Sequence, residues 1–186
     1  MFSTKLLYLL LAMATIGPIQ AVQYTVTNNA TGKPGGTRFE NEIGIPYSQQ
    51  TIELASEFTW KTFQQNEGDR RYYDQVIMMV NSFKGVAFTL SNSIQVSSEY
   101  VANYTGDVRI EIVGDLYHEM THVWQWHGNK NTPFGLMEGI ADYVRLKAGW
   151  AKEGVVRDGM KVIKLQLILL SIGMGVKMGL LLSLML

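Results

Sequence analysis

The stretch Y-H-E-M-T-H-V-W-Q-W, from Tyr117 to Trp126, contains two of the three histidines of the chain. It belongs to a longer segment, Asp107–Gly128, whose apolar residues recur at the period of an α-helix. On a helix, His118 and His122 lie one turn apart and share a face. The segment therefore predicts a helix that presents two imidazole rings and the neighbouring carboxylate of Glu119 side by side.

Two imidazoles at this spacing can bind one metal ion, and the carboxylate of Glu119 can act on a water molecule next to it. H-E-x-x-H on a helix is the signature of zinc hydrolases, and with only three histidines in the chain a chance match is unusual. A solvated amphipathic helix that happens to carry histidines is the alternative. The pattern favours a Zn²⁺ site with His118 and His122 as ligands and Glu119 as the catalytic base.

A catalytic zinc usually takes three protein ligands, so a third ligand is expected downstream. His127 lies one residue short of the third histidine in the related motif H-E-x-x-H-x-x-G-x-x-H, which favours a surface histidine. Glu138 and Asp142 lie four residues apart on a second predicted helix, so their carboxylates share a face. One of the two acids can bind the metal while the other holds a ligand histidine through its ring N–H.

This second helix is predicted from Thr132 as N-cap and Pro133 as first helical residue to Gly149 as C-cap. An ordinary pair of exposed acids is the alternative interpretation of Glu138 and Asp142. Gly139 argues against it, because a glycine inside a helix costs about 1 kcal/mol relative to alanine and implies the close approach of another element.

The rest of the chain predicts one α+β domain, because a strand and a helix precede a small sheet and the two helices described above. The alternation in Ser93–Tyr100 makes it a candidate edge strand that could pair with an extended peptide, an ordinary sheet strand being the alternative. The predicted elements are a strand near Val22–Thr27, a helix within Pro46–Gln65, and strands near Gln75–Asn81, Gly85–Leu90 and Ser93–Ser98.

Composition excludes several classes of function. The 186 residues, 47% of them hydrophobic, suffice for one domain with a core. Sixteen basic and sixteen acidic residues cancel, so the chain has no net charge that would attract nucleic acid, and no nucleic-acid partner is expected. The absence of cysteine excludes disulfides and thiol catalysis. Composition does not predict the oligomeric state.

Residues 1–21 have the features of a secretory signal peptide: an early lysine, Lys5, an apolar run from Leu6 to Ile16, and a small residue at Ala21. The apolar run is shorter than the roughly 20 residues that a membrane-spanning helix needs. We therefore expect an extracellular protein. On the secretory route, Asn29 and Asn103, each in an N-x-T sequence, are candidate glycosylation sites.

The motifs that contain the two histidines and the downstream acids resemble those of known protein families. H-E-x-x-H followed by E-G-x-A-D-Y is similar to the gluzincin superfamily of zinc peptidases. L-Y-H-E-M-T-H-V-W-Q-W and G-L-M-E-G-I-A-D-Y-V-R-L-K-A-G resemble more closely the plant basic secretory protein family, secreted peptidases of plants and bacteria. The upstream motifs Y-T-V-T-N, P-G-G-T-R-F and G-V-A-F-T resemble it too, so that the similarity runs from Val22 to Gly149.

The resemblance implies a zincin-like α+β fold, with a small sheet packed on helices, and a secreted zinc metalloendopeptidase that hydrolyses peptide bonds through a zinc-activated water. It implies Glu138 as the third zinc ligand and Asp142 as the residue that holds a ligand histidine. Peptides or proteins would be the substrates, plant defence the biological setting, and the apoplast the location if the source is a plant. A secreted, non-catalytic defence or binding protein on the same zinc scaffold is the alternative.

The resemblance stops at Trp150. When plausible codons for two runs of the tail, 158–168 and 174–185, are read in another frame, they give W-D-E-G-Y-Q-V-T-A-Y and N-G-S-K-N-G-F-V-A-E-L-N, which resemble the continuation of the family. The hypothesis is that 22–150 is a peptidase domain truncated at its C-terminal side and that 151–186 is a frame-shifted apolar tail that lowers solubility and activity. A membrane helix from Leu165 to Leu186 is the alternative, and membrane association is not expected otherwise.

Overall fold

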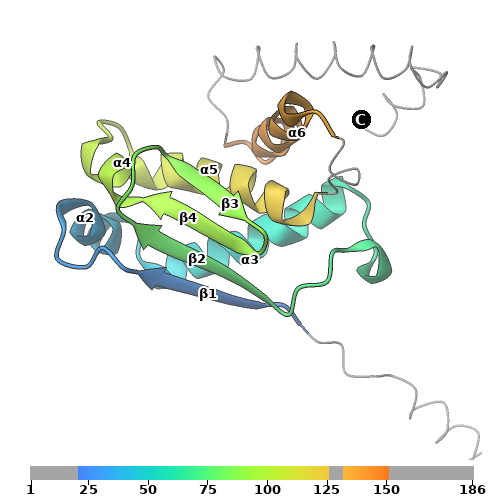
Figure 1. Ribbon diagram of the computed structural model, residues 1–186, viewed down its shortest axis with the longest axis horizontal. Helices are drawn as coiled ribbons and strands as arrows, with labels where there is room; N and C mark the ends of the chain where they lie inside the picture. Colours follow the sequence, from blue (N-terminus) through green and yellow to red (C-terminus); the bar gives the residue numbers. More distant parts are fainter. Residues whose placement is uncertain (1–20, 126–131, 151–186) are drawn as a thin grey trace, which may run out of the picture.

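The structure, a computed structural model, describes residues 21–125 and 132–150. In these residues a four-stranded sheet and five α-helices form an α+β fold, as predicted (Figure 1). The strands are β1 (Gln23–Asn28), β2 (Gln75–Asn81), β3 (Ala87–Leu90) and β4 (Ser93–Ser97). The helices are α2 (Pro34–Glu42), α3 (Ile45–Thr62), the short 3₁₀ helix η1 (Glu67–Asp69), α4 (Ser98–Asn103), α5 (Val108–Trp124) and α6 (Phe134–Lys147).

The strands are arranged in the order β1-β2-β4-β3. β1, β2 and β4 are parallel, and β3 pairs antiparallel with β4. The prediction that Ser93–Tyr100 is an edge strand is therefore wrong. A tight turn at Ser91, whose φ is 57°, folds β3 back onto β4, so β4 has a partner on both sides and β3 forms the edge. The stretch also leaves the sheet at Ser98, where α4 begins.

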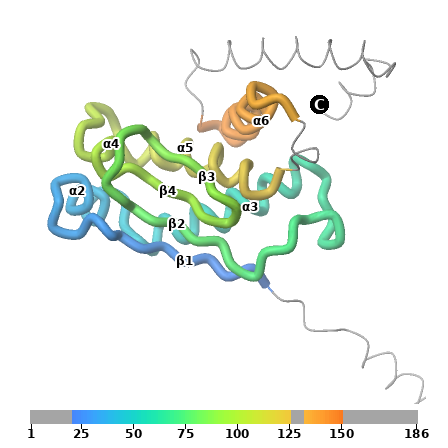
Figure 2. The backbone as a smooth tube through the Cα atoms, viewed as in Figure 1, coloured from blue at the N-terminus to red at the C-terminus, as the bar shows by residue number. Residues whose placement is uncertain are grey.

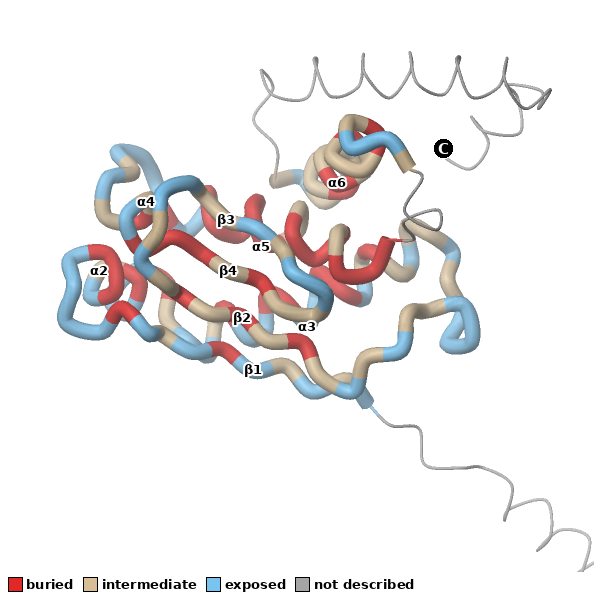
Figure 3. Tube along the Cα trace, viewed as in Figure 1, coloured by how far each residue is buried: buried red, intermediate tan, exposed pale blue. Residues whose placement is uncertain are grey.

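Helices α3 and α5 cover one face of the sheet, and α6 packs on the side of α5 that faces away from α3 (Figures 1 and 2). The core fills the space between these helices and the sheet (Figure 3). Alternate residues of β2 and β4 point into it, as the period of two predicts, and are fully buried: Val76, Met78, Val80, Ile94 and Val96. Trp124 also belongs to the core, and its Nε1 donates to Ser56 Oγ of α3 at 3.0 Å.

Helix α5 is buried on most of its circumference, because the sheet and α3 cover one side and α6 the other. Asp107 caps its first turn by accepting from the N–H of Ile110 at 3.1 Å. The helix ends at Trp124, earlier than the predicted end near Gly128, because Gln125 adopts an extended conformation. Arg71 donates to the carbonyl oxygen of Val123 at 3.2 Å, which satisfies one of the open carbonyls of the last turn.

Helix α6 begins one residue later than predicted. Pro133 is its N-cap and has an extended ψ of 136°, so Thr132 does not cap the helix and Pro133 is not its first residue. At the other end Ala148 is the C-cap, and Gly149 follows it with a φ of 83°. The cap therefore lies one residue before the predicted one, and Gly149 takes the left-handed position that commonly follows the end of a helix.

Helix α2 was not predicted, because P-G-G-T has the composition of a turn and glycine has low helix propensity. Packing against α4 outweighs that propensity. A Cβ on Gly35 would overlap the backbone carbonyl of Ser98, so a glycine is required where the two helices meet.

No helix in the ranges 21–125 and 132–150 combines the length and the apolar character that crossing a membrane requires. The predicted signal peptide, apart from Ala21, and the apolar tail lie outside the described residues.

Gly35→Ala should lower the free energy of unfolding by about 2 kcal/mol or more, because the new methyl group can be accommodated only if α2 and α4 separate. Gly68→Ala is the matched control, since nothing lies within 4 Å of a Cβ at that position, and its effect should stay within about 0.5 kcal/mol. Urea unfolding followed by circular dichroism measures both. Equal stability of the two variants would show that the α2–α4 contact is not tight.

Candidate metal centre

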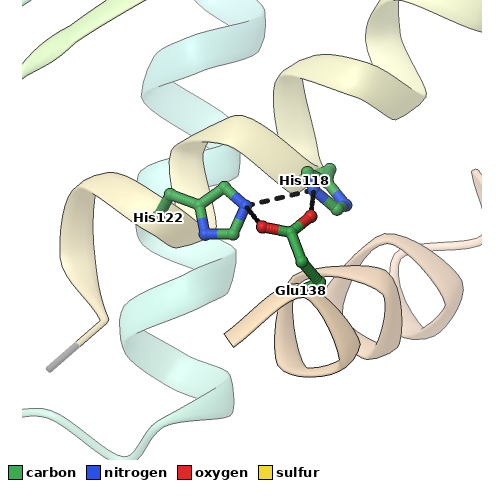
Figure 4. A group of neighbouring side chains, drawn as sticks. All are labelled: His118, His122 and Glu138. Carbon is green, nitrogen blue, oxygen red and sulfur yellow. Dashed lines mark hydrogen bonds and ion pairs between the residues drawn. The ribbon is translucent and has the colours of Figure 1, made fainter. Parts of the chain in front are cut away.

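The packing of α5 against α6 brings together the residues singled out in the sequence. His118, Glu119 and His122 come from the buried part of α5, and Glu138 and Asp142 come from successive turns of α6. In Figure 4 the carboxylate of Glu138 points at the two imidazole rings from the opposite helix. Two helices, α5 and α6, thus supply all five side chains.

His118, His122 and Glu138 form a compact triangle. The Nε2 atoms of the two rings are 3.1 Å apart. The carboxylate of Glu138 lies 3.3 Å from each of these atoms, with Oε2 toward His118 and Oε1 toward His122. Among the described residues, these are the three whose ligand atoms gather within 4.8 Å of one another in a group able to hold a metal ion.

Asp142 lies at the other nitrogen of His118. Its Oδ1 is 2.9 Å from Nδ1 of that ring, on the side away from the triangle. A carboxylate in this place accepts the Nδ1–H and leaves the Nε2 lone pair directed at the centre of the triangle. The residues alone left open which of the two acids binds the metal. In the structure the two acids face different nitrogens of His118: Glu138 lies at Nε2 and Asp142 at Nδ1.

Neighbouring side chains shift the pKa values of His118 and Glu138. Burial lowers the pKa of His118, but its hydrogen bonds to Asp142 and Glu138 outweigh burial and raise the pKa to about 9. The hydrogen bonds from His118 and His122 lower the pKa of Glu138 to about 2. The site is therefore a strongly anionic position that attracts positive charge, whether protons or a metal cation.

The donor set fits zinc. Two imidazole nitrogens and one carboxylate are ligands that Zn²⁺ takes at about 2.0–2.2 Å, and neighbouring ligands around a tetrahedral ion at that distance are about 3.3 Å apart. The separations of 3.1 Å between the two rings and 3.3 Å from each ring to the carboxylate are close to that value.

Glu119 is held apart from the triangle by the edge strand. Its side chain is 7% exposed, and the hydroxyl of Thr89 lies 2.7 Å from its Oε2 and 3.0 Å from its backbone oxygen. Thr89 was not singled out in the sequence, because nothing in G-V-A-F-T-L signals that its fifth residue reaches α5. The hydrogen bond from Thr89 fixes the carboxylate of Glu119 beside the cluster of His118, His122 and Glu138, to which Glu119 does not belong.

A cavity of about 300 Å³ opens beside the triangle. His118, Glu119, Glu138 and Asp142 line one part of it, and Val86, Ala87, Tyr100, Glu111, Asp115 and Arg145 line the rest. Arg145 of α6 donates to Asp115 Oδ1 at 2.9 Å. A Cβ on Gly114 would lie only 2.7 Å from Nε of Arg145, so the glycine leaves room for the guanidinium beside α5. The cavity is large enough for a side chain of a substrate.

A second cavity, of about 610 Å³, lies at the C-terminal end of α5 and is lined by Trp60, Arg70 and Trp124 among others. It is larger, but none of the five residues of the metal centre lines it. The guanidinium of Arg70 lies 4.0 Å from the centre of the Trp60 ring, which ties η1 to α3. Size alone therefore does not identify the site in this chain.

The model of a family described as peptidases of plants and bacteria matches residues 19–162. The chain belongs to this family. The match includes both helices of the metal centre and extends past Trp150, where the motif-based resemblance stops. No curated protein and no solved structure was found to match. Family membership indicates a peptidase acting on peptides or proteins.

The remaining predicted residues are placed as follows. Asn29 and Asn103 are both exposed. The amide nitrogen of Asn29 donates to Asn81 Oδ1 at 3.0 Å, and that of Asn103 donates to the carbonyl of Glu99 at 2.7 Å. His127 lies outside the described residues. Arg145 was not singled out in the sequence. A usable signal was present, because Glu111 and Asp115 lie four residues apart on one predicted helix and Arg145 is a cation near the end of the next.

Asp115 should make stability depend on pH. Burial raises its pKa to about 7 despite Arg145, which opposes the shift, while Glu111 adds repulsion. Because the unfolded chain loses this proton near pH 4 and the folded chain only near pH 7, wild-type stability falls as pH rises through that window. Asp115→Asn removes this titration. The free energy of unfolding of the variant, relative to that of the wild type, should therefore increase by about 1 kcal/mol or more from pH 4.5 to pH 8.

The measurement is urea unfolding with a chelator present, so that metal affinity does not enter. Asp74→Asn, at an exposed aspartate, is the control and should keep a constant difference from the wild type. A variant that instead loses stability relative to the wild type as pH rises would mean that Asp115 is ionised and paired with Arg145 throughout.

Proposed function

We propose that this chain is a secreted zinc-dependent peptidase that cleaves peptide bonds within polypeptides. The observation that carries the proposal is the position of the Glu138 carboxylate, 3.3 Å from the Nε2 atom of each histidine of the H-E-x-x-H helix. Membership of a peptidase family supports the reaction, and the donor set supports the metal.

In this proposal His118, His122 and Glu138 hold the zinc ion. Asp142 keeps His118 in the tautomer whose Nε2 faces the metal. Bound zinc supplies a Lewis acid that polarises the scissile carbonyl and makes water a stronger nucleophile near neutral pH.

Glu119 is the proposed base. It takes the proton from the attacking water and delivers it to the nitrogen of the leaving amine, so the proton is conserved through the reaction. The hydroxyl of Thr89, 2.7 Å from Glu119 Oε2, keeps the carboxylate from rotating away. Because Thr89 belongs to β3, the edge strand and the base are coupled directly.

Strand β3 takes the place of Ser93–Tyr100 as the proposed docking edge for substrate. It is one of the two outer strands of the sheet, and it contacts α5. Its outward side chains, Phe88 and Leu90, are 40% and 63% exposed. An extended peptide that adds to this edge would lie along the helix that carries the metal ligands.

Secretion is proposed from the N-terminal signal sequence and is supported by the positions of the two N-x-T sequences. Both Asn29 and Asn103 are exposed, as acceptors of a bulky glycan have to be. The non-catalytic alternative retains the same three ligands and differs only in whether Glu119 has a chemical role.

Glu119→Gln should bind zinc as the wild type does and lose peptide hydrolysis by about 10²- to 10⁴-fold, because the amide cannot accept the proton from water. Zinc content is measured by atomic absorption, and hydrolysis by mass spectrometry of a mixture of unstructured peptides. Glu53→Gln, on the exposed surface of α3, is the control. A wild type that binds zinc but cleaves no peptide would favour the non-catalytic alternative.

Glu138→Ala and His122→Ala should each lose stoichiometric zinc, because both remove a ligand. Asp142→Ala should keep one zinc ion per chain with an affinity about 10- to 100-fold lower, because it removes only the group that orients His118. Competition with a fluorescent chelator measures all three affinities. Loss of zinc in Asp142→Ala combined with retention in Glu138→Ala would reverse the roles of the two acids.

A further inference from the structure

Gln125 is fixed beside the second histidine of the metal centre. Its side chain is 4% exposed. Its backbone N–H donates to the carbonyl of Thr121 at 2.8 Å, and its own carbonyl accepts from Arg71 at 3.5 Å. The side-chain amide nitrogen lies 3.1 Å from Nδ1 of His122. Gln125 thus faces His122 as Asp142 faces His118, from the side of the ring away from the triangle.

The orientation of the Gln125 amide determines which ring nitrogen of His122 carries the proton. When the amide N–H of Gln125 donates to Nδ1, that nitrogen is an acceptor, so the neutral ring carries its proton on Nε2. There it can donate to Oε1 of Glu138, 3.3 Å away. The network is then complete without a metal, except that Oε1 of Gln125 is buried and has no partner among the described residues.

A metal ion needs the opposite assignment. His122 can bind through Nε2 only with its lone pair, so the single proton of the ring has to be on Nδ1. An N–H facing another N–H is unfavourable. If the amide turns by half a rotation, Oε1 replaces Nε2 at 3.1 Å from the ring, accepts the Nδ1–H, and gains the partner that it lacks. The turn gives up the contact of the amide nitrogen with the carbonyl of Met137, which at 3.5 Å is weak.

We propose that Gln125 is a positioning residue for the metal, and that its amide turns when the metal binds: it donates to His122 Nδ1 in the metal-free protein and accepts from it in the metal-bound protein. The inference rests on the proposed function, since it assumes that His122 is a ligand. His122 stays neutral with one proton in both states, and only the nitrogen that carries the proton changes.

The experiment compares zinc affinity in two variants of the full chain. Gln125→Met has similar length but no acceptor, so zinc affinity should fall by about 10- to 100-fold. Gln125→Glu provides a carboxylate that accepts the Nδ1–H without turning, as Asp142 does on the other ring, so its affinity should equal or exceed that of the wild type. Gln50→Met, on the exposed surface of α3, is the control and should be neutral.

The second readout is the tautomer of His122, obtained from the ¹⁵N shifts of its ring with and without zinc. We expect the proton on Nε2 in the metal-free protein and on Nδ1 in the zinc-bound protein. This measurement uses the wild type, so it stands even if Gln125→Met does not fold. The same tautomer in both states, unchanged affinity in Gln125→Met, or a loss in Gln125→Glu equal to that in Gln125→Met overturns the proposal. A wild type that binds no zinc would instead overturn the proposed function, and this inference with it.

Discussion

Two imidazole nitrogens 3.1 Å apart, with a carboxylate 3.3 Å from each, are a costly arrangement for a protein interior unless positive charge is shared among them. The packing of α5 against α6 imposes this arrangement. α5 is in turn fixed by the sheet and α3, which leave it little freedom to rotate and release the strain. The depressed pKa of Glu138 and the raised pKa of His118 express the same constraint in the metal-free chain.

The burial of α5 also explains why so many ionisable groups of this chain lie in one layer. A helix covered on both sides has no solvated face for its polar residues, so each needs a partner inside the protein. Glu111 accepts from Tyr100 and Tyr104, Asp115 from Arg145, and Glu119 from Thr89. The two tyrosines come from α4 and its C-cap, Arg145 comes from α6, and Thr89 comes from β3. The polar residues of α5 therefore tie together the edge strand, α4 and α6 around the metal centre.

The local part of this arrangement was accessible from sequence. The spacing of His118 and His122, and of Glu138 and Asp142, determines which side chains share a helix face. The runs that form β2 and β4 were likewise predicted as strands, and the period of two determines which of their residues point into the core. The sequence could not say how the strands are ordered, since hydrophobic alternation is the same in an inner and an edge strand. This is why Ser93–Tyr100 was misplaced and Thr89 overlooked. Helix α2 was missed because Gly35 serves a contact with Ser98, which is 63 residues away and has no local signal.

The same limit applies to the residues that orient the histidines. Asp142 could be anticipated because it shares a helix face with Glu138, whereas Gln125 lies just beyond the end of α5, where periodicity no longer applies. What holds Gln125 there is Arg71, which precedes it by more than fifty residues and donates to the last carbonyls of the helix. The two ligand histidines are consequently supported in different ways. His118 has an anionic partner that can only accept, and His122 has a neutral partner that can donate or accept. An amide at the second position gives Nδ1 of His122 a donor in the metal-free site, which a second carboxylate, unable to donate to Nδ1, would not provide.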